Sequence, residues 1–242
     1  IGSADSLYSR AFADCSALTT INLSETGAES IGNYAFNGCS ALTSVTFPKT
    51  LLTIGGRAFL NCTGLTSLTL PASVTDVGDW AFRGCTSLAA LTMEPVPGGE
   101  QTHYMSFGSY ALADCAALTS VSFSENLTVL GDYAMTRCNG LTRITLPSGV
   151  ARVGNCAFLS CPGLTAVEVS DDNQTYCAKN SMLMNKDQTY IVYCPPAGRT
   201  ACTIPYGVTG VAAYAFQDAT GLQKVFYDGS PNQWETEVLP NI

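Results

Sequence analysis

Apolar and polar positions along the chain form a unit that returns about every 23 residues. In the string LTSLTLP, residues 65–71, leucines at Leu65, Leu68 and Leu70 are separated by small β-favouring residues. Alternation with a period of two predicts a short strand with one buried face. In the string VGDWAFRGC, residues 77–85, the apolar residues have the spacing of a helical turn. The pattern therefore predicts one strand and one or two turns of helix in each unit.

About eight copies of the 23-residue unit are visible, and internal repetition of this kind indicates a repeat architecture. After a partial copy at 10–24, the copies begin at Ile31, Ile54, Val77, Phe107, Leu130, Val153 and Val211. The interval of 30 residues before Phe107 indicates an insertion near 94–107. The interval of 58 residues before Val211 indicates a divergent, hairpin-like insert near 171–210.

A unit of this length cannot bury its apolar face alone, so successive units must stack into a solenoid. Their strands then lie side by side in a parallel β-sheet on one face, and the short helical turns form the other face. Parallel strands are almost always connected by right-handed crossovers. We therefore expect an α/β solenoid that coils as a right-handed superhelix.

The L-x-x-L-x-L spacing resembles that of leucine-rich repeats. The strings I-G-x-x-A-F-x-x-C and C-x-x-L-x-x-L-x-L-P, both present in 54–71, are similar to those of the BspA-like subfamily, typified by a bacterial cell-surface antigen. Residues 176–216 resemble the hairpin-containing insert of that family, and residues 225–234 resemble its final coil. The resemblance implies one leucine-rich repeat domain over 1–242, with a C-terminal cap at 225–242. It also implies an extracellular or cell-surface location, with a leader that is absent from this sequence.

Two repeat positions predict the core. One position carries a phenylalanine in six copies, at Phe12, Phe36, Phe59, Phe82, Phe158 and Phe216. Another carries a cysteine in seven copies, at Cys15, Cys39, Cys62, Cys85, Cys115, Cys138 and Cys161. Stacked coils give neighbouring cysteines parallel Cα–Cβ vectors, which do not suit a disulfide, so we expect buried unpaired thiols. Cys194 and Cys202 lie outside this row, and a bridge between them stays open.

A third repeat position, immediately before the phenylalanine, carries mostly aromatic and arginine side chains. Its members are Arg10, Tyr34, Arg57, Trp80, Tyr110, Tyr133, Cys156 and Tyr214. Exposed side chains of these types can bind partners or sugars. Alternatively, the rings cover the predicted helical layer while their polar ends stay in water. The sequence favours the second interpretation.

Composition excludes several classes of function. Charged residues make up 12% of the chain, and the formal net charge of -8 argues against nucleic acid and against an anionic membrane surface. No apolar run is long enough to insert into a membrane. The one histidine, His103, excludes multi-histidine metal sites, and no nucleophile string accompanies it or Glu100. We expect no catalytic residues, no metal and no cofactor, and a solvated turn at 171–173.

Binding is then expected on the exposed face of the sheet. In the first half of the chain this face is nearly uniform serine and threonine, whereas Arg143, Glu168, Lys224 and Phe226 add charge and an aromatic ring towards the C-terminus. These four residues are the candidate ligand-binding site. The prediction is a non-enzymatic, adhesin-like bacterial surface protein that binds a protein partner, with a glycan as a further ligand class. The alternative is a carbohydrate-binding or scaffold module of a larger exported enzyme or nutrient-uptake system.

Overall fold

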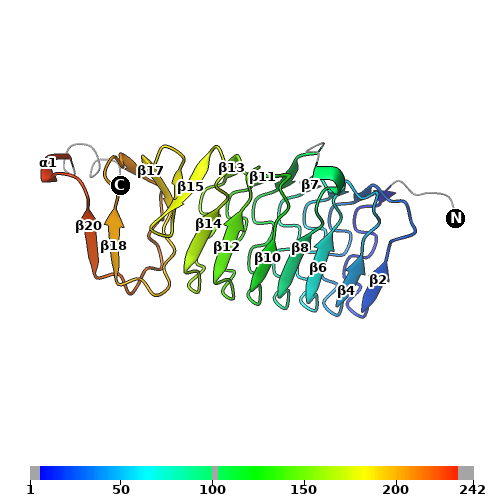
Figure 1. Cartoon of the computed structure of the whole chain (residues 1–242). Coiled ribbons are helices and arrows are strands. Elements are labelled where there is room, and N and C mark those ends of the chain that lie inside the picture. The colour runs from blue at the N-terminus through cyan, green and yellow to red at the C-terminus, as the bar shows by residue number, and fades with distance from the viewer. Residues whose placement is uncertain (1–5, 100–102, 234–242) are drawn as a thin grey trace.

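The computed structural model describes residues 6–99 and 103–233 as a row of stacked coils (Figure 1). Each L-x-x-L-x-L segment forms a strand that faces the same side of the row. These strands are β2 (Thr20–Asn22), β4 (Ser44–Thr46), β6 (Ser67–Leu70), β8 (Ala90–Met93), β10 (Ser120–Ser122), β12 (Arg143–Leu146) and β14 (Ala166–Val169). Neighbouring strands pair in parallel, in the groups β2–β4, β6–β8–β10 and β12–β14. We call this side of the molecule the strand face.

A second parallel sheet, which the sequence analysis did not predict, runs along the row. It contains seven strands in sequence order: β1 (Ser6–Leu7), β3 (Ser30–Ile31), β5 (Thr53–Ile54), β7 (Asp76–Val77), β9 (Met105–Phe107), β11 (Leu127–Leu130) and β13 (Arg152–Val153). Each strand ends at the apolar residue that opens the repeat. Each of coils one to seven therefore adds one strand to the strand face and one strand to this second sheet.

The predicted helical turns are absent, and the α/β description was wrong. The segment between the two strands of a coil is an arc, which covers 10–15, 34–39, 57–62, 80–85, 110–115, 133–138, 156–161 and 214–219 in coils one to eight. Residues at the first and fifth positions of each arc have positive φ, as at Tyr34 (60°) and Gly38 (73°). A helix would need negative φ throughout. The described residues contain only the one-turn helices η1 (Pro97–Gly99) and α1 (Pro231–Gln233).

Because of the positive φ values, every second amide of an arc points out of its own coil and towards the next coil. In coil two, the amides of Tyr34, Phe36 and Gly38 donate to carbonyls of coil three at 3.1, 2.7 and 2.8 Å. The amides between them close turns within their own coil, as Ala35 does to Gly32. The arcs are therefore held by hydrogen bonds between coils, as strands are, and not by the bonds of a helix.

Side chains continue these contacts beside the glycine that follows each short strand. A Cβ atom on Gly131 would lie 2.5 Å from the carbonyl carbon of Gly108, so only glycine allows the coils to approach this closely. Asn33 Oδ1 accepts a hydrogen bond from the Gly56 amide of the next coil at 2.7 Å, and Asp132 Oδ1 accepts one from the Asn155 amide at 3.0 Å. Together with the bond from the Ser109 amide to Asp79 Oδ1 at 2.6 Å, these side-chain acceptors add a hydrogen bond between coils at every second junction from coil two to coil seven.

The phenylalanine row forms the apolar spine that the sequence predicted. The rings of Phe36, Phe59 and Phe82 are fully buried and stack in order, with centroids 5.0 and 5.2 Å apart. Leu112 and Met135 continue the buried row through coils five and six. The spine is continuous through coil seven, where Phe158 belongs to the same core, whereas Phe216 of coil eight packs against a separate core.

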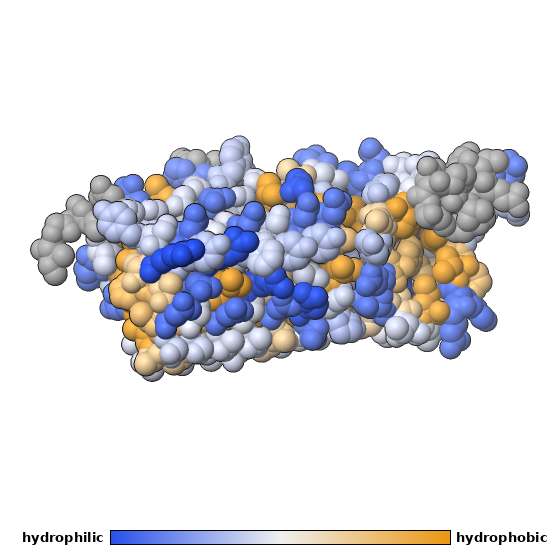
Figure 2. Space-filling model, turned by 180° about the vertical axis from the view of Figure 1, so that it is seen from behind, coloured by the Kyte–Doolittle hydropathy of each residue, from blue (hydrophilic) through white to orange (hydrophobic). Residues whose placement is uncertain are grey.

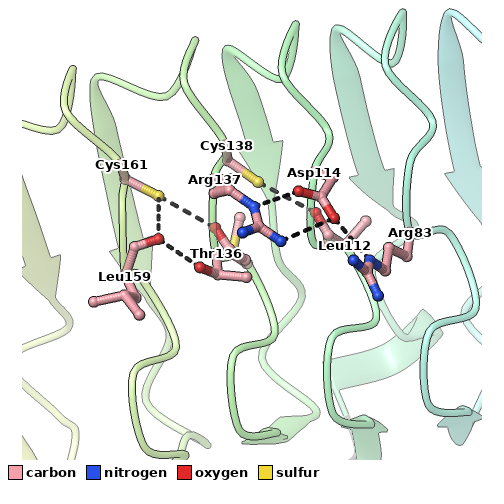
Figure 3. Close-up of polar contacts among 9 residues, drawn as sticks. Arg83, Leu112, Asp114, Thr136, Arg137, Cys138, Leu159 and Cys161 are labelled. Carbon is pink, nitrogen blue, oxygen red and sulfur yellow. Dashed lines mark hydrogen bonds and ion pairs between the residues drawn. The ribbon is translucent and has the colours of Figure 1, made fainter.

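The cysteine row has a second role besides packing. Each thiol from Cys39 to Cys161 donates a hydrogen bond to a carbonyl of the preceding coil, as Cys62 does to Phe36 at 3.1 Å. Figure 3 shows the bond from Cys138 to Leu112, which measures 3.2 Å. Burial raises the pKa of the Cys62 thiol to about 12. The prediction of buried, unpaired thiols is confirmed for these six residues. It was wrong for Cys15, which is exposed because it lies in the first coil.

The divergent segment contains an antiparallel hairpin of β15 (Tyr176–Lys179) and β16 (Met182–Asn185). Its two turn residues, Asn180 and Ser181, both have positive φ, as the tight hairpin turn requires. Strand β17 (Tyr190–Tyr193) pairs with β16 and with β19 (Gly210–Val211), and β18 (Ala201–Ile204) pairs with β20 (Lys224–Tyr227). This region has a small core of its own, which includes Met182, Met184 and Ile191. Residues 234–242 of the predicted cap lie outside the described residues.

Truncation of the spine should destabilise the protein far more than truncation of the strand face. We expect Phe59→Ala to lower the free energy of unfolding by roughly 3–5 kcal/mol, because it leaves a cavity between two stacked rings. The matched control, Phe226→Ala, removes a ring that is 53% exposed and should cost less than about 1 kcal/mol. Urea unfolding of both variants measures the difference, and equal costs would show that the spine is not the core.

The thiol row can be tested by alkylation. Under native conditions iodoacetamide should modify Cys15 and spare Cys39, Cys62, Cys85, Cys115, Cys138 and Cys161, because these six are buried and poorly ionised. After denaturation all seven should react, as mass spectrometry of the peptides would show. A disulfide between Cys62 and Cys85 would contradict the stacking of the coils.

Candidate binding surface

Register on the strand face brings two of the predicted site residues together. Pairing of β12 with β14 places Arg143 beside Ala166 and Thr145 beside Glu168. Arg143 Nη1 forms an ion pair with Glu168 Oε1, and the Thr145 hydroxyl donates to Glu168 Oε2 at 3.1 Å. The two charged side chains are 61% and 45% exposed. They form one polar patch that a partner can reach.

The other two predicted residues form a second patch. Lys224 and Phe226 lie on β20, beside Ala201 and Thr203 of β18. Strands β18 and β20 form a two-stranded sheet of their own, apart from the sheet of β12 and β14, so the two patches lie on different sheets. Val225 occupies the repeat position of the buried Ile144, yet it is 49% exposed because β20 is the last strand of the described residues. The four predicted residues are therefore two pairs and not one cluster.

Most of the flat faces of the aromatic and arginine row are covered. The Arg57 guanidinium lies 5.4 Å from the centroid of the Tyr34 ring and 4.8 Å from that of Trp80. Tyr110 stacks on Tyr133 with centroids 4.8 Å apart. Cation–π and ring stacking thus occupy faces that a sugar would need. This geometry supports the structural interpretation of the row.

An ion-pair network on the arcs also joins neighbouring coils (Figure 3). Asp114 accepts hydrogen bonds from Arg83 Nε at 2.7 Å and from Arg137 Nε at 2.5 Å, so one carboxylate links three coils. Burial acts to raise the pKa of Asp114, but the hydrogen bonds from the two arginines hold it below its ordinary value. Because all three side chains are engaged with one another, this network is better explained by stacking of the coils than by binding.

An open groove at the carboxyl ends of β8, β10, β12 and β14 was missed by sequence reasoning. Its lining includes the hydroxyl-bearing residues Ser122, Ser124, Ser148 and Ser170, with Glu125, Asp172 and the ring of Phe123. Glu125 Oε2 accepts hydrogen bonds from the Ser148 amide at 3.0 Å and from its hydroxyl at 2.5 Å. The serines near the ends of β10, β12 and β14 were the available signal, but Pro95 and Val96, which also line the groove, belong to the insertion, whose fold the repeat does not predict.

The turn at 171–173 is only partly solvated. Asp171 and Asp172 are exposed, whereas Asn173 is fully buried. Its Nδ2 donates to the carbonyls of Pro147 and Val150, and its Oδ1 accepts from the amides of Thr175 and Tyr176. The prediction of a solvated turn was therefore wrong for Asn173, which fixes the insert to coil six. The residue type did not show this, because asparagine is equally common in exposed turns.

The chemistry-bearing residues outside the sheet are few. His103 is exposed, and Glu100 lies outside the described residues. Cys194 and Cys202 are both buried in the small core as free thiols, and the Cys202 thiol donates a hydrogen bond to Met182 Sδ at 3.6 Å. Within 6–99 and 103–233, no group of three metal-ligating side chains occurs. Neither short helix in these ranges has the length and apolar character to cross a bilayer.

Stacked coils with an L-x-x-L-x-L strand in each define a leucine-rich repeat solenoid. The sequence profile of the BspA type leucine rich repeat region matches residues 5–96 and 101–196, in six copies, and the chain belongs to this family. A comparison with curated proteins found no match.

Three solved bacterial structures have a similar fold. A leucine-rich repeat protein from Eubacterium ventriosum is 24% identical with a TM-score of 0.64, over 77% of this chain and 50% of that one. The pneumococcal vaccine antigen PcpA is 23% identical with a TM-score of 0.57, over 86% and 44% of the two chains. A leucine-rich repeat protein from Bacteroides ovatus is 21% identical with a TM-score of 0.56, over 93% and 57%. The chain thus spans about half the length of these proteins, and the likeness shows the fold alone.

The ion pair on the strand face should add little to stability. A double-mutant cycle of Arg143→Ala and Glu168→Ala should give a coupling energy of about 0.2–1 kcal/mol at low salt, because both side chains are exposed and the pair is screened by water. The coupling should fall further as the salt concentration rises. A coupling above about 2 kcal/mol would show that the pair is needed for folding, and would remove it from the candidate site.

Proposed function

We propose that the chain is the binding part of a bacterial cell-surface protein that attaches to a protein partner through its strand face. The observation that carries this proposal is the exposed patch of Arg143, Thr145 and Glu168 on a sheet that hydrogen bonds hold rigid. The surface location rests on the family and on the description of PcpA as a pneumococcal vaccine antigen.

The physical basis of this function is a rigid surface with a few discriminating side chains. The backbone of the strand face is fixed by pairing, so binding costs little conformational entropy there. Exposed hydroxyls, such as those of Thr46 and Thr69, offer hydrogen bonds but little discrimination between partners. Arg143 and Phe226 belong to residue types that anchor protein interfaces, and charge adds a penalty for a wrong partner. We expect contacts to concentrate at the C-terminal end of the face.

A second candidate function is binding of a glycan, within a larger exported enzyme or nutrient-uptake system. The groove lined by serine hydroxyls, Glu125 and the Phe123 ring favours it, because sugars are recognised by polar side chains around an apolar ring. Both candidates are non-enzymatic for this chain, which is a prediction from the lack of a paired acid and base or an activated nucleophile in the sequence.

Binding arrays can separate the two candidates. We would probe one array of mammalian and bacterial extracellular proteins and one array of glycans with the labelled chain. A protein hit should lose about tenfold or more affinity with Arg143→Ala or Phe226→Ala, as truncation of an interface anchor does. The matched controls, Thr46→Ala and Thr69→Ala, should stay within about twofold, because they lie on the same face without charge or ring.

The arrays also show how the proposal would fail. Equal losses from both pairs of variants, or a loss only from the threonines, would remove the C-terminal patches as the binding site. Hits confined to the glycan array that are weakened by Phe123→Ala and unaffected by Arg143→Ala would replace the first candidate with the second. Turnover of any ligand that disappears with His103→Ala would contradict a non-enzymatic role.

A further inference from the structure

The hydrogen bonds between arcs stop at one junction. From coil one to coil six, three amides of every arc donate to three carbonyls of the following coil. In coil six the donors are Tyr133, Met135 and Arg137, at 2.9, 2.8 and 2.9 Å. In coil seven the equivalent amides belong to Cys156, Phe158 and Ser160, and none of the three has an acceptor among the described residues. Three backbone amides that donate hydrogen bonds at six junctions therefore lack an acceptor at the seventh, within the ranges that the structure describes.

The insert explains this break. Residues after β17 stand where coil eight would stack, and the Cys194 amide donates to Ala215 O at 2.8 Å, the carbonyl that the repeat would offer to Phe158. Pro195 and Pro196 follow and have no amide to continue the pattern. At the level of the spine the gap is filled, because the Tyr193 and Phe158 rings lie 5.6 Å apart. The inner part of the gap is therefore closed.

The outer part of the gap is a groove of about 410 Å³. Residues 153–156 of coil seven line one side, and Ala212 and Ala213 of coil eight line the other, with Tyr176 and Tyr190 from the insert. Cys156 is the only small side chain of its row, whose other members are tyrosine, tryptophan or arginine. Its size leaves the mouth of the groove open. Strand β13 is also the last of its seven-stranded sheet among the described residues, and its outward-facing Val153 amide donates a hydrogen bond to the Tyr176 hydroxyl at 2.9 Å.

The six other junctions show which chemical group accepts hydrogen bonds from the amides of an arc. At six junctions the partner of the arc is a line of main-chain carbonyls. The groove lining holds no lysine or arginine. Close to it, the negative charge of Asp218 adds to the burial that raises the pKa of Tyr193 and of Cys161. The chain also carries a net charge of -8, so the surroundings disfavour an anion. Neutral main-chain carbonyl oxygens fit both the donors and the charge.

We propose that the groove between coils seven and eight is a docking site for a peptide segment of a partner protein. The segment lies against the outer side of coil seven, and one of its carbonyls accepts a hydrogen bond from the Cys156 amide, as a carbonyl of the next coil does at each of the six other junctions. Tyr193 bounds the site on the inside, and Tyr176 and Tyr190 provide apolar surface for its side chains. This site is separate from the strand face and does not depend on it.

A pair of variants at one position tests the docking site. Cys156→Tyr restores the side chain that Tyr133 has at nearly the same φ, 57° against 55°, and should close the groove without strain. Cys156→Ser keeps the side chain small and is the matched control. The probe is a phage-displayed library of random twelve-residue peptides, panned on the folded chain. Enriched peptides should bind the parent and Cys156→Ser alike and Cys156→Tyr at least tenfold more weakly.

Two further measurements fix the location and the occupant. Adding an enriched peptide should slow hydrogen exchange of the Cys156 amide and leave that of Tyr133 unchanged, and Ala213→Trp, which fills the groove from coil eight, should abolish the effect. The proposal is overturned if no peptide is enriched, or if enriched peptides bind Cys156→Tyr undiminished. It is also overturned if acetate or phosphate alone shifts the Cys156 amide, or if a dimer of this chain forms and is lost with Cys156→Tyr. Arg143→Ala should leave peptide binding intact, which separates this test from that of the strand face.

Discussion

Hydrogen bonding between successive arcs is the constraint on which the rest of the structure depends. Positive φ at two positions of each arc costs free energy at a non-glycine residue, about 1–2 kcal/mol in the left-handed region. In coils one to six, three backbone hydrogen bonds from each arc to the next coil offset that cost. The same stacking brings each buried thiol to a carbonyl of the preceding coil and each phenylalanine onto the next ring. Glycine at positions such as Gly131 is then a condition of how closely the coils approach.

Sequence reasoning identified the parts of the fold whose signal is the burial of side chains. The strands of the L-x-x-L-x-L segments, the phenylalanine spine and the thiol row all follow from which residues are apolar. The arcs were mistaken for helical turns because the spacing of Val77, Ala81 and Phe82 fits either conformation. Nothing in the residue types shows positive φ at Tyr34 or Trp80, since large side chains rarely adopt it. The backbone pattern is imposed by the neighbouring coil, which the local sequence does not describe.

The candidate site was predictable to a similar extent. Repeat register placed Arg143 and Glu168 on exposed positions of adjacent strands, so their pairing follows from the period alone. The separation of Lys224 and Phe226 from that pair could not be foreseen, because the length of an insert does not reveal where its strands pair. On the rear face (Figure 2), hydrophobic side chains gather at both ends of the row, and those at the C-terminal end lie where the regular stacking is interrupted. Regular coils thus provide the rigid scaffold, and the features suited to recognition lie where the repeat changes.

Scalar couplings across hydrogen bonds, measured by NMR on the isotope-labelled protein, test the arcs most directly. The account predicts a coupling from the Phe59 amide nitrogen to the carbonyl carbon of Ala81, 22 residues ahead in the next coil, and the equivalent coupling from Phe82 to Ala111. A coupling from Phe59 to the carbonyl of Gly55, four residues earlier in its own coil, would show a helix. That result would contradict stacking by inter-coil hydrogen bonds.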